Sequence, residues 1–196
     1  MKKTRFSKQI QFIAEIDKLK TIKRLCWLLD GSRQENDAEH SWQLAVMAIV
    51  LCQHSNQEID LLKVIKMLLI HDIVEIDAGD CSRYDTQARI NKYSLEKKAA
   101  IRIFGLLPKK QAIEFKNLWE EYCEHKTPEA NFASAIDKFQ PVFHNHTNKG
   151  KPWDEYNISG KQIIDASKNI STGSEKIWQY AHELIKDAVK KGFIKK

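Results

Sequence analysis

The chain has 196 residues, of which 42% are apolar and 30% are charged, and its formal net charge is +6. These values exclude a disordered chain and suit one globular domain with a hydrophobic core. Only 7 glycines and 4 prolines occur, about 6% of the residues where ~12% is ordinary, which disfavours turn-rich sandwiches and barrels.

Apolar spacing and capping residues predict helices along most of the chain. They cover residues 7–29, 36–52, about 60–75, 92–104, 110–122, 127–141 and 175–189. Asn36 with Glu39 forms a capping-box pattern at the start of the second helix. Pro141 is expected to kink or end the sixth helix, and residues 145–175 are the least regular part. No segment alternates apolar and polar residues for long, which predicts an all-α fold in one domain.

The third predicted helix carries charge in apolar surroundings. From Leu61 to Ile76 it is apolar on nearly every side, which is typical of a buried helix. Its last turns nevertheless hold His71, Asp72 and Glu75. A buried carboxylate costs several kcal/mol unless it is paired or bound to a metal. On an α-helix Glu75 is i+4 from His71 and i+3 from Asp72, so the three side chains can face one cavity.

Two further residues suggest what this cavity binds. His40 lies near the predicted start of the second helix, and Asp137 lies beside Ile136 on the apolar face of the sixth. Alone, His71 would be explained by a hydrogen bond to a neighbouring helix. Together, two imidazoles and two carboxylates from three helices suit a divalent transition metal and leave positions open for water and a substrate oxygen.

The order of these residues resembles a known signature. His40, His71-Asp72 and Asp137 are similar to the H…HD…D signature of the HD-domain metal-dependent phosphohydrolases, over roughly residues 20–145. Three segments resemble the 5'-deoxynucleotidase-like branch: AEHSW (Ala38–Trp42), HDIVEIDAGD (His71–Asp80), and LWEEY (Leu118–Tyr122) followed by TPEA. The resemblance implies a helical HD-type core at about residues 20–145. With the helix pattern, it predicts one HD-type domain over residues 1–196 that ends in an irregular segment (145–175) and a helix at about 175–191.

The resemblance also implies roles at the metal. The ligands would be His40, His71, Asp72 and Asp137. Glu75 matches the carboxylate that orients or deprotonates the attacking water. The alternative for Glu75 is a hydrogen bond that orients one of the ligands. Such a ligand set accepts one divalent ion of Mn, Co, Fe, Ni or Zn according to availability.

Substrate contacts are implied in the same way. Asp80 matches a residue of the branch that contacts the substrate sugar. An adjacent Arg-Trp pair before the first histidine binds phosphate and base in that branch, whereas here Arg24 and Trp27 are separated by Leu25-Cys26. Arg33 is therefore an alternative phosphate contact, since a guanidinium binds phosphate with paired hydrogen bonds.

These parts predict a metal-dependent phosphohydrolase that hydrolyses a phosphomonoester of a (deoxy)nucleotide by attack of a metal-activated water. An HD-type phosphodiesterase or pyrophosphohydrolase is the alternative within the enzyme class. A non-catalytic module that binds phosphate or nucleic acid is the alternative from another class. The complete set of four ligands favours the enzyme.

The positive charge lies at the two ends of the chain. Residues 1–24 hold 8 basic and 2 acidic side chains, and residues 186–196 hold 5 basic and 1 acidic. Between them, residues 25–185 hold 19 basic and 23 acidic side chains. The segment with the predicted site is mildly acidic, which argues against nucleic acid as the partner and is compatible with a cation site.

Weaker features of the sequence bear on the cellular compartment and on the oligomeric state. The longest apolar run, Ala45–Cys52, is far short of the ~20 residues that span a bilayer. Four scattered cysteines and a polar N-terminus predict a reduced, cytoplasmic protein. The resemblance suggests a homodimer, and Trp42 and Trp119 are expected in the core or at a subunit interface.

Some candidates near the C-terminal part have two interpretations. His144 and His146 lie beyond Pro141, and a supporting or surface role is preferred to metal binding. Trp153 and Tyr156 are candidates for a lid over an aromatic anionic ligand, or else belong to a packed surface loop.

Overall fold

The computed structural model describes residues 4–85, 87 and 90–195. Helices dominate it, which confirms the all-α fold class. The α-helices are α1 (Arg5–Ile16), α2 (Asp37–Leu51), α3 (Leu61–Ile70), α4 (Glu75–Ala78), α6 (Lys92–Phe104), α7 (Lys109–Glu124), α8 (Pro128–Thr147), α9 (Lys151–Glu155), α10 (Gly160–Ser167), α11 (Ile170–Gly173) and α12 (Glu175–Lys190). The 3-10 helices are η1 (Asp17–Thr21), η2 (Cys52–His54) and η3 (His71–Val74), and the strands are β1 (Lys23–Trp27) and β2 (Gln34–Asn36).

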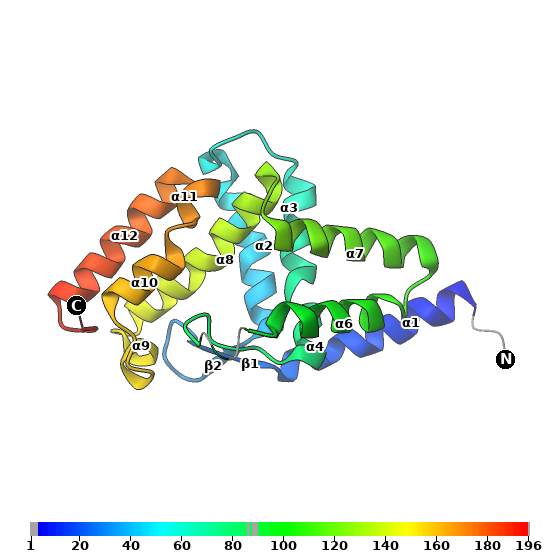
Figure 1. Cartoon of the computed structure of the whole chain (residues 1–196), viewed down its shortest axis with the longest axis horizontal. Helices are drawn as coiled ribbons and strands as arrows, with labels where there is room; N and C mark the ends of the chain where they lie inside the picture. The colour runs from blue at the N-terminus through cyan, green and yellow to red at the C-terminus, as the bar shows by residue number, and fades with distance from the viewer. Residues whose placement is uncertain (1–3, 86, 88–89, 196) are drawn as a thin grey trace.

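The helices are arranged around a central group. Figure 1 shows α2, α3 and α8 in the middle of an elongated molecule, with α10, α11 and α12 towards the C-terminus and α1, α6 and α7 on the other side. Helix α8 packs against α2, α3, α7, α11 and α12. Within the described part of the chain, no helix has both the length and the apolar character needed to cross a membrane.

The prediction of one helix over residues 7–29 was wrong beyond residue 16. Helix α1 ends there, η1 follows, and β1 then pairs with β2 as an antiparallel hairpin. Gly31 sits in the connecting turn at φ 69°, where glycine has no steric penalty. In β1, Arg24 and Cys26 face inward while their neighbours are more exposed. This alternation spans only five residues. The longer helical spacing of apolar residues around it therefore predicted a helix instead of a strand.

The predicted helix over residues 60–75 changes geometry at its functional end. Helix α3 stops at Ile70, His71–Val74 form the 3-10 helix η3, and α4 begins at Glu75. A 3-10 helix has three residues per turn, so Asp72 and Glu75 lie one above the other. This replaces the predicted α-helical i+4 relation between His71 and Glu75. Gly79, at φ 73°, ends α4.

The C-terminal half differs from the expectations in two places. Of the two alternatives for Pro141, an end of the sixth helix is wrong, because α8 continues past it to Thr147. Since proline has no N–H, the carbonyl of Asp137 lacks the usual helical partner four residues later. Residues 145–175 are not irregular, because α9, α10 and α11 lie within them. Ser159 and Gln162 form a capping box at the start of α10.

Helix α3 takes part in two clusters of buried apolar side chains. Its residues Met67 and Leu68 belong to a cluster that includes residues of α2, α8 and α12. Ile70 and the following Ile73 belong to a second cluster, which includes residues of α1, α6 and α7. The His71-Asp72 pair therefore lies where the two clusters meet, and close packing there restricts the positions of these side chains.

Candidate active site

The four predicted metal ligands come together from three elements. His40 on α2 and the pair His71-Asp72 on η3 have ligand atoms within 4.8 Å of one another. Asp137 on α8 joins them, with its Oδ1 atom 3.1 Å from His40 Nε2 and 3.9 Å from His71 Nε2. The tertiary structure thus brings two imidazoles and two carboxylates together, and this donor set suits a divalent transition metal.

His71 has one ring nitrogen suited to a metal. Its Nδ1 lies 2.9 Å from the carbonyl oxygen of Leu68, and a carbonyl only accepts, so Nδ1 carries the proton. Nε2 is then an acceptor, and it is buried without a hydrogen-bond partner among the described residues. A buried acceptor without a partner costs free energy. A metal ion would satisfy it, so the donor set fits the ion that the sequence predicts.

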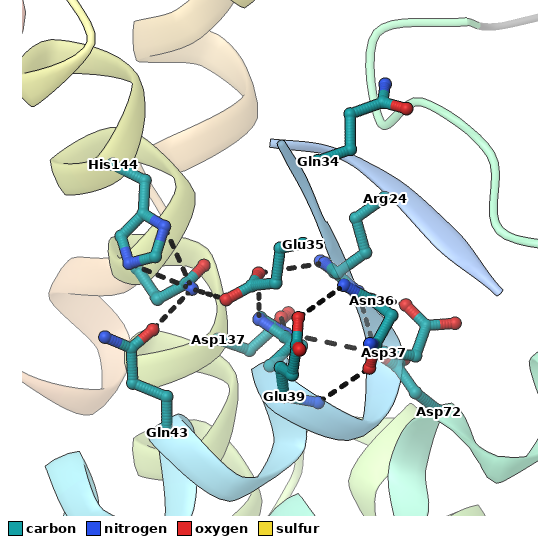
Figure 2. Close-up of polar contacts among 12 residues, drawn as sticks. Arg24, Gln34, Glu35, Asn36, Asp37, Glu39, Gln43, Asp72, Asp137 and His144 are labelled. Atoms are coloured by element: carbon teal, nitrogen blue, oxygen red, sulfur yellow. Dashed lines mark hydrogen bonds and ion pairs between the residues drawn. The ribbon is translucent and has the colours of Figure 1, made fainter. Parts of the chain in front are cut away.

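His40 is held from behind by a buried carboxylate. Its Nδ1 lies 3.5 Å from Glu35 Oε2, while its Nε2 faces Asp137. Glu35 is 1% exposed and accepts a 2.8 Å hydrogen bond from the side-chain amide of Gln140. Figure 2 shows Glu35 at the centre of these contacts. A carboxylate behind a histidine fixes the orientation of the ring and increases its basicity towards a metal.

Arg24 forms a second support for the ligands. Its Nη1 donates to Asp72 Oδ2 at 2.8 Å and to Asp37 Oδ1 at 3.0 Å (Figure 2). Burial would raise the pKa of Asp72, but the positive charge of Arg24 holds it below its ordinary value. Burial and the charge of Asp72 raise the pKa of Asp37 to about 8, against the effect of Arg24. Asp72 is therefore the anionic partner at neutral pH.

Asp137 is anionic for a similar reason. Burial would raise the pKa of its carboxyl group, but the hydrogen bond with His40 and the positive charge of Arg83 bring it well below the ordinary value. The hydroxyl group of Tyr122 donates to Asp137 Oδ2 at 3.2 Å. Tyr122 thus orients the second oxygen of this carboxylate while Oδ1 faces the histidines.

Glu75 differs from these ligands in its surroundings. It is buried at the start of α4, where burial and the charge of Asp72 raise its pKa to about 9. Lys92 opposes this rise and donates to Glu75 Oε2 at 2.7 Å. Because this pKa lies above neutral pH, Glu75 is protonated there in the absence of a metal ion, and a bound cation would favour the carboxylate form that a general base needs.

A cavity of about 390 Å³ opens beside the ligand cluster. Glu75 and the ligands His71, Asp72 and Asp137 line it, while His40 lies behind them, fully buried. Asp80 also lines it. The cavity is large enough for a small phosphorylated molecule, and its volume falls in the range of ordinary ligand pockets, ~300–1,000 Å³.

Other residues of the cavity wall were missed by sequence reasoning. They include Arg83, Lys92, Tyr93 and Tyr122. Tyr122 belongs to the LWEEY segment, which resembles the 5'-deoxynucleotidase-like branch but did not indicate a function for this tyrosine. Lys92 is the first residue of α6, and nothing in its neighbourhood in sequence distinguishes it from other surface lysines.

Two predicted substrate contacts lie elsewhere. Arg33 is exposed and forms a bidentate pair with Glu39, at 2.8 and 2.6 Å. Trp27 lies under Lys151, whose Nζ is 3.3 Å from the centre of an indole ring. Neither lines the cavity, whereas Arg24 does. Of the residues predicted to bind the phosphate or the base, Arg24 lines the cavity, and Trp27 and Arg33 do not.

The four candidates that follow Pro141 in the chain have different surroundings. His144 is buried behind the site, with Nδ1 3.1 Å from the carbonyl oxygen of Trp27. His146 Nε2 lies 2.7 Å from Asp187. Trp153 is buried and Tyr156 is largely exposed, and both line the cavity.

Comparison with known proteins identifies the family. A family model described as HD domain matches residues 16–178. A protein of Dictyostelium discoideum named 5'-deoxynucleotidase HDDC2 is 34% identical over 83% of this chain and 89% of its own length. The protein of the same name from Danio rerio is 30% identical over 73% of this chain and 72% of its own length.

The fold comparison agrees. A crystal structure described as a predicted metal-dependent phosphohydrolase from Magnetospirillum magnetotacticum MS-1 superimposes with a TM-score of 0.92. It is 43% identical and covers 98% of this chain and 99% of that one. The matched family model spans all four candidate ligands as well as Glu75 and Asp80. The chain belongs to the HD-domain family.

Proposed function

We propose that this protein is a metal-dependent phosphohydrolase that releases orthophosphate from a deoxynucleoside 5'-monophosphate. The observation that carries the proposal is the ligand cluster on the cavity wall, with the buried Nε2 of His71 open for a metal. The names of the Dictyostelium and zebrafish relatives support the substrate class, and that of the Magnetospirillum protein supports the reaction class.

The ligands would be His40, His71, Asp72 and Asp137. A divalent ion held by them supplies a water of lowered pKa and polarises a phosphoryl oxygen. Its identity follows from availability, among Mn, Co, Fe, Ni and Zn. Glu35, buried behind His40, and Arg24 and Tyr122 on the cavity wall would hold the orientation of the ligands.

Glu75 would accept the proton of the attacking water. The water oxygen then forms a bond to phosphorus, the ester P–O bond breaks, and the leaving 5'-oxygen takes up a proton. A base with a raised pKa favours the first of these proton transfers. Asp80, on the same cavity wall, would accept a hydrogen bond from a sugar hydroxyl. Arg24 lines the cavity next to Asp72, and its guanidinium group would bind the phosphate.

The test is phosphate release by purified, metal-loaded protein. We expect orthophosphate from deoxynucleoside 5'-monophosphates and little product from a phosphodiester or a nucleoside triphosphate. Asp72→Ala should lose bound metal and activity, while Asp165→Ala, an exposed aspartate on α10, should keep both. Absence of orthophosphate from a broad panel of monoesters, with metal bound, would contradict the proposal.

We also propose that the protein is a cytoplasmic homodimer. All four cysteines are free, which supports a reducing compartment. Helix α2 presents Trp42, 65% exposed, together with Val46, Ile49 and Val50 on one face. A large exposed apolar face is typical of an interaction surface. Sedimentation equilibrium should give twice the chain mass for the natural protein and a monomer for Val50→Asp.

A further inference from the structure

Lys92 contacts both ends of the one-turn helix α4. Its ammonium group donates to Glu75 Oε2 at 2.7 Å and to the carbonyl oxygen of Gly79 at 2.8 Å. Glu96, one turn further along α6, lies 3.6 Å from the same nitrogen. An ammonium group has three N–H donors. These donors therefore face three oxygens, of which the two closest belong to the first residue of α4 and to the residue that ends it.

The contact with Gly79 bears on Asp80. Gly79 adopts φ 73°, a backbone conformation that places the next residue in a new direction. Asp80 follows directly and lines the cavity. One lysine thus connects the proposed general base to the turn that carries the proposed sugar contact.

The charges around Glu75 make this lysine important. Asp72 on η3 and Glu96 on α6 are negative groups facing Glu75, and the thiol of Cys123 on α7 is close by. The positive charge of Lys92 opposes their effect on Glu75. A positive partner favours the ionised form of a buried carboxylate that lies beside like charges. Lys92 is itself half-buried and lines the cavity.

We propose that Lys92 is a positioning residue of the active site: its ammonium group holds the Glu75 carboxylate and the Gly79 turn in one arrangement, so that Glu75 faces the attacking water and Asp80 faces the sugar. This inference rests on the proposed function. Lys92 acts through Glu75 and Asp80 and takes no part in bond making.

The first experiment compares Lys92→Met, Lys92→Arg and a matched control. Lys116→Met is the control, because Lys116 forms an ion pair with Glu120 at 2.9 Å on the surface of α7. With metal saturating, we expect Lys92→Met to lower kcat by about 10²-fold or more, within the range for loss of a general base. KM should rise as well because Asp80 is displaced. Lys92→Arg should recover part of kcat, and Lys116→Met should match the natural protein.

Metal affinity separates a positioning role from damage to the metal centre. Calorimetric titration with Mn²⁺ should give the same dissociation constant for Lys92→Met and for the natural protein. A kcat of Lys92→Met equal to that of Lys116→Met would overturn the inference. So would a loss of metal affinity that accounts for the whole loss of activity.

A measurement that requires no turnover tests the role of Lys92 independently of the proposed reaction. Carboxyl carbon NMR of protein labelled at glutamate, with Glu75→Gln to assign the signal, follows the ionisation of Glu75 directly. We expect Glu75 to ionise at higher pH in Lys92→Met than in the natural protein. An unchanged titration would overturn the inference. A natural protein that releases no orthophosphate from any monoester would instead reject the proposed function and leave this titration to decide on Lys92. If Lys92→Met does not fold, Lys92→Gln takes its place in each measurement.

Discussion

At the scale of single residues, the buried charges around the metal ligands are matched by nearby partners. Arg24 lies between Asp37 and Asp72, and Glu35 is held by Gln140. Removing one partner from such a pair leaves the other charge buried and costs ~3–5 kcal/mol. These contacts therefore maintain the ligand geometry as well as the stability of the fold.

Glu35→Gln tests the support behind His40. The amide keeps the shape of the side chain but loses the negative charge 3.5 Å from His40 Nδ1. We expect the affinity for Mn²⁺ to fall by 10–100-fold, which is about the usual effect of removing a partner of a ligating histidine. Isothermal titration calorimetry measures this. Glu39→Gln, which alters an exposed pair with Arg33, should leave the affinity unchanged. An equal affinity in both variants would contradict the role of Glu35.

Glu75→Gln tests the cost of burying that carboxylate. Its pKa is about 9 in the folded protein against an ordinary value of about 4.3, so the folded state binds more protons between these limits. Stability therefore falls as pH rises through this window. Without metal, the free energy of unfolding of Glu75→Gln should gain on that of the natural protein from pH 5 to pH 9. Urea unfolding at several pH values checks this. An identical pH dependence would contradict the shift, and the surface variant Glu114→Gln serves as the control.

At the scale of elements, the site depends on local departures from regular helix. The 3-10 geometry of η3 aligns Asp72 with Glu75, and α8 continues through Pro141 beyond Asp137. Helix α11 packs closely against α8. A Cβ atom on Gly173 would lie 2.2 Å from the carbonyl oxygen of Asn131 and 2.9 Å from Ala135 Cβ. The two helices approach as closely as they do because residue 173 has no side chain.

Gly173→Ala should accordingly separate α11 from α8. The clash is with backbone atoms, which cannot rotate away, so we expect a loss of ~1–3 kcal/mol in the free energy of unfolding, as for other overpacked interiors. Thr172→Ala, at the exposed neighbouring position, should change stability little. Urea unfolding distinguishes the two variants, and equal stabilities would show that the contact is not tight.

At the scale of the whole molecule, the metal ligands join parts that belong to different apolar clusters. His40 and Asp137 come from helices of the first cluster, and His71-Asp72 stand at the junction with the second. An ion that binds the folded state alone stabilises it by mass action, by about 2.7 kcal/mol at a concentration of 100 Kd.

The expected consequence is a rise in melting temperature on adding metal. For a chain of this size ~1 kcal/mol corresponds to roughly 2–4 °C, so Mn²⁺ at 100 Kd should raise Tm by about 5–10 °C. His71→Ala should show no such rise, whereas His54→Ala, outside the ligand cluster, should respond like the natural protein. Differential scanning calorimetry measures all three. A rise in His71→Ala would show that the ion binds elsewhere.

Much of this molecule follows from local sequence. The low content of glycine and proline and the apolar periodicity predicted the helices, and Asn36 with Glu39 does form the predicted capping box. The short alternation in β1 and the 3-10 turn at His71 were not predicted, and at Pro141 the sequence left open whether the helix kinks or ends. In each case the local pattern fits two conformations of similar energy, and packing against distant segments selects one.

The same division holds for the site. By itself the sequence determined which residues have ligand chemistry and that they lie in apolar surroundings, because residue type and periodicity are local properties. Only the tertiary structure decided that Lys92 contacts Glu75, that Glu35 lies behind His40, and that Arg24 rather than Arg33 lines the cavity. Lys92 and Glu75 come from different helices, Glu35 and His40 from a strand and a helix, and Arg24 meets Asp72 from 48 residues away. The energy of a buried charge depends on which partner the fold brings within hydrogen-bonding distance.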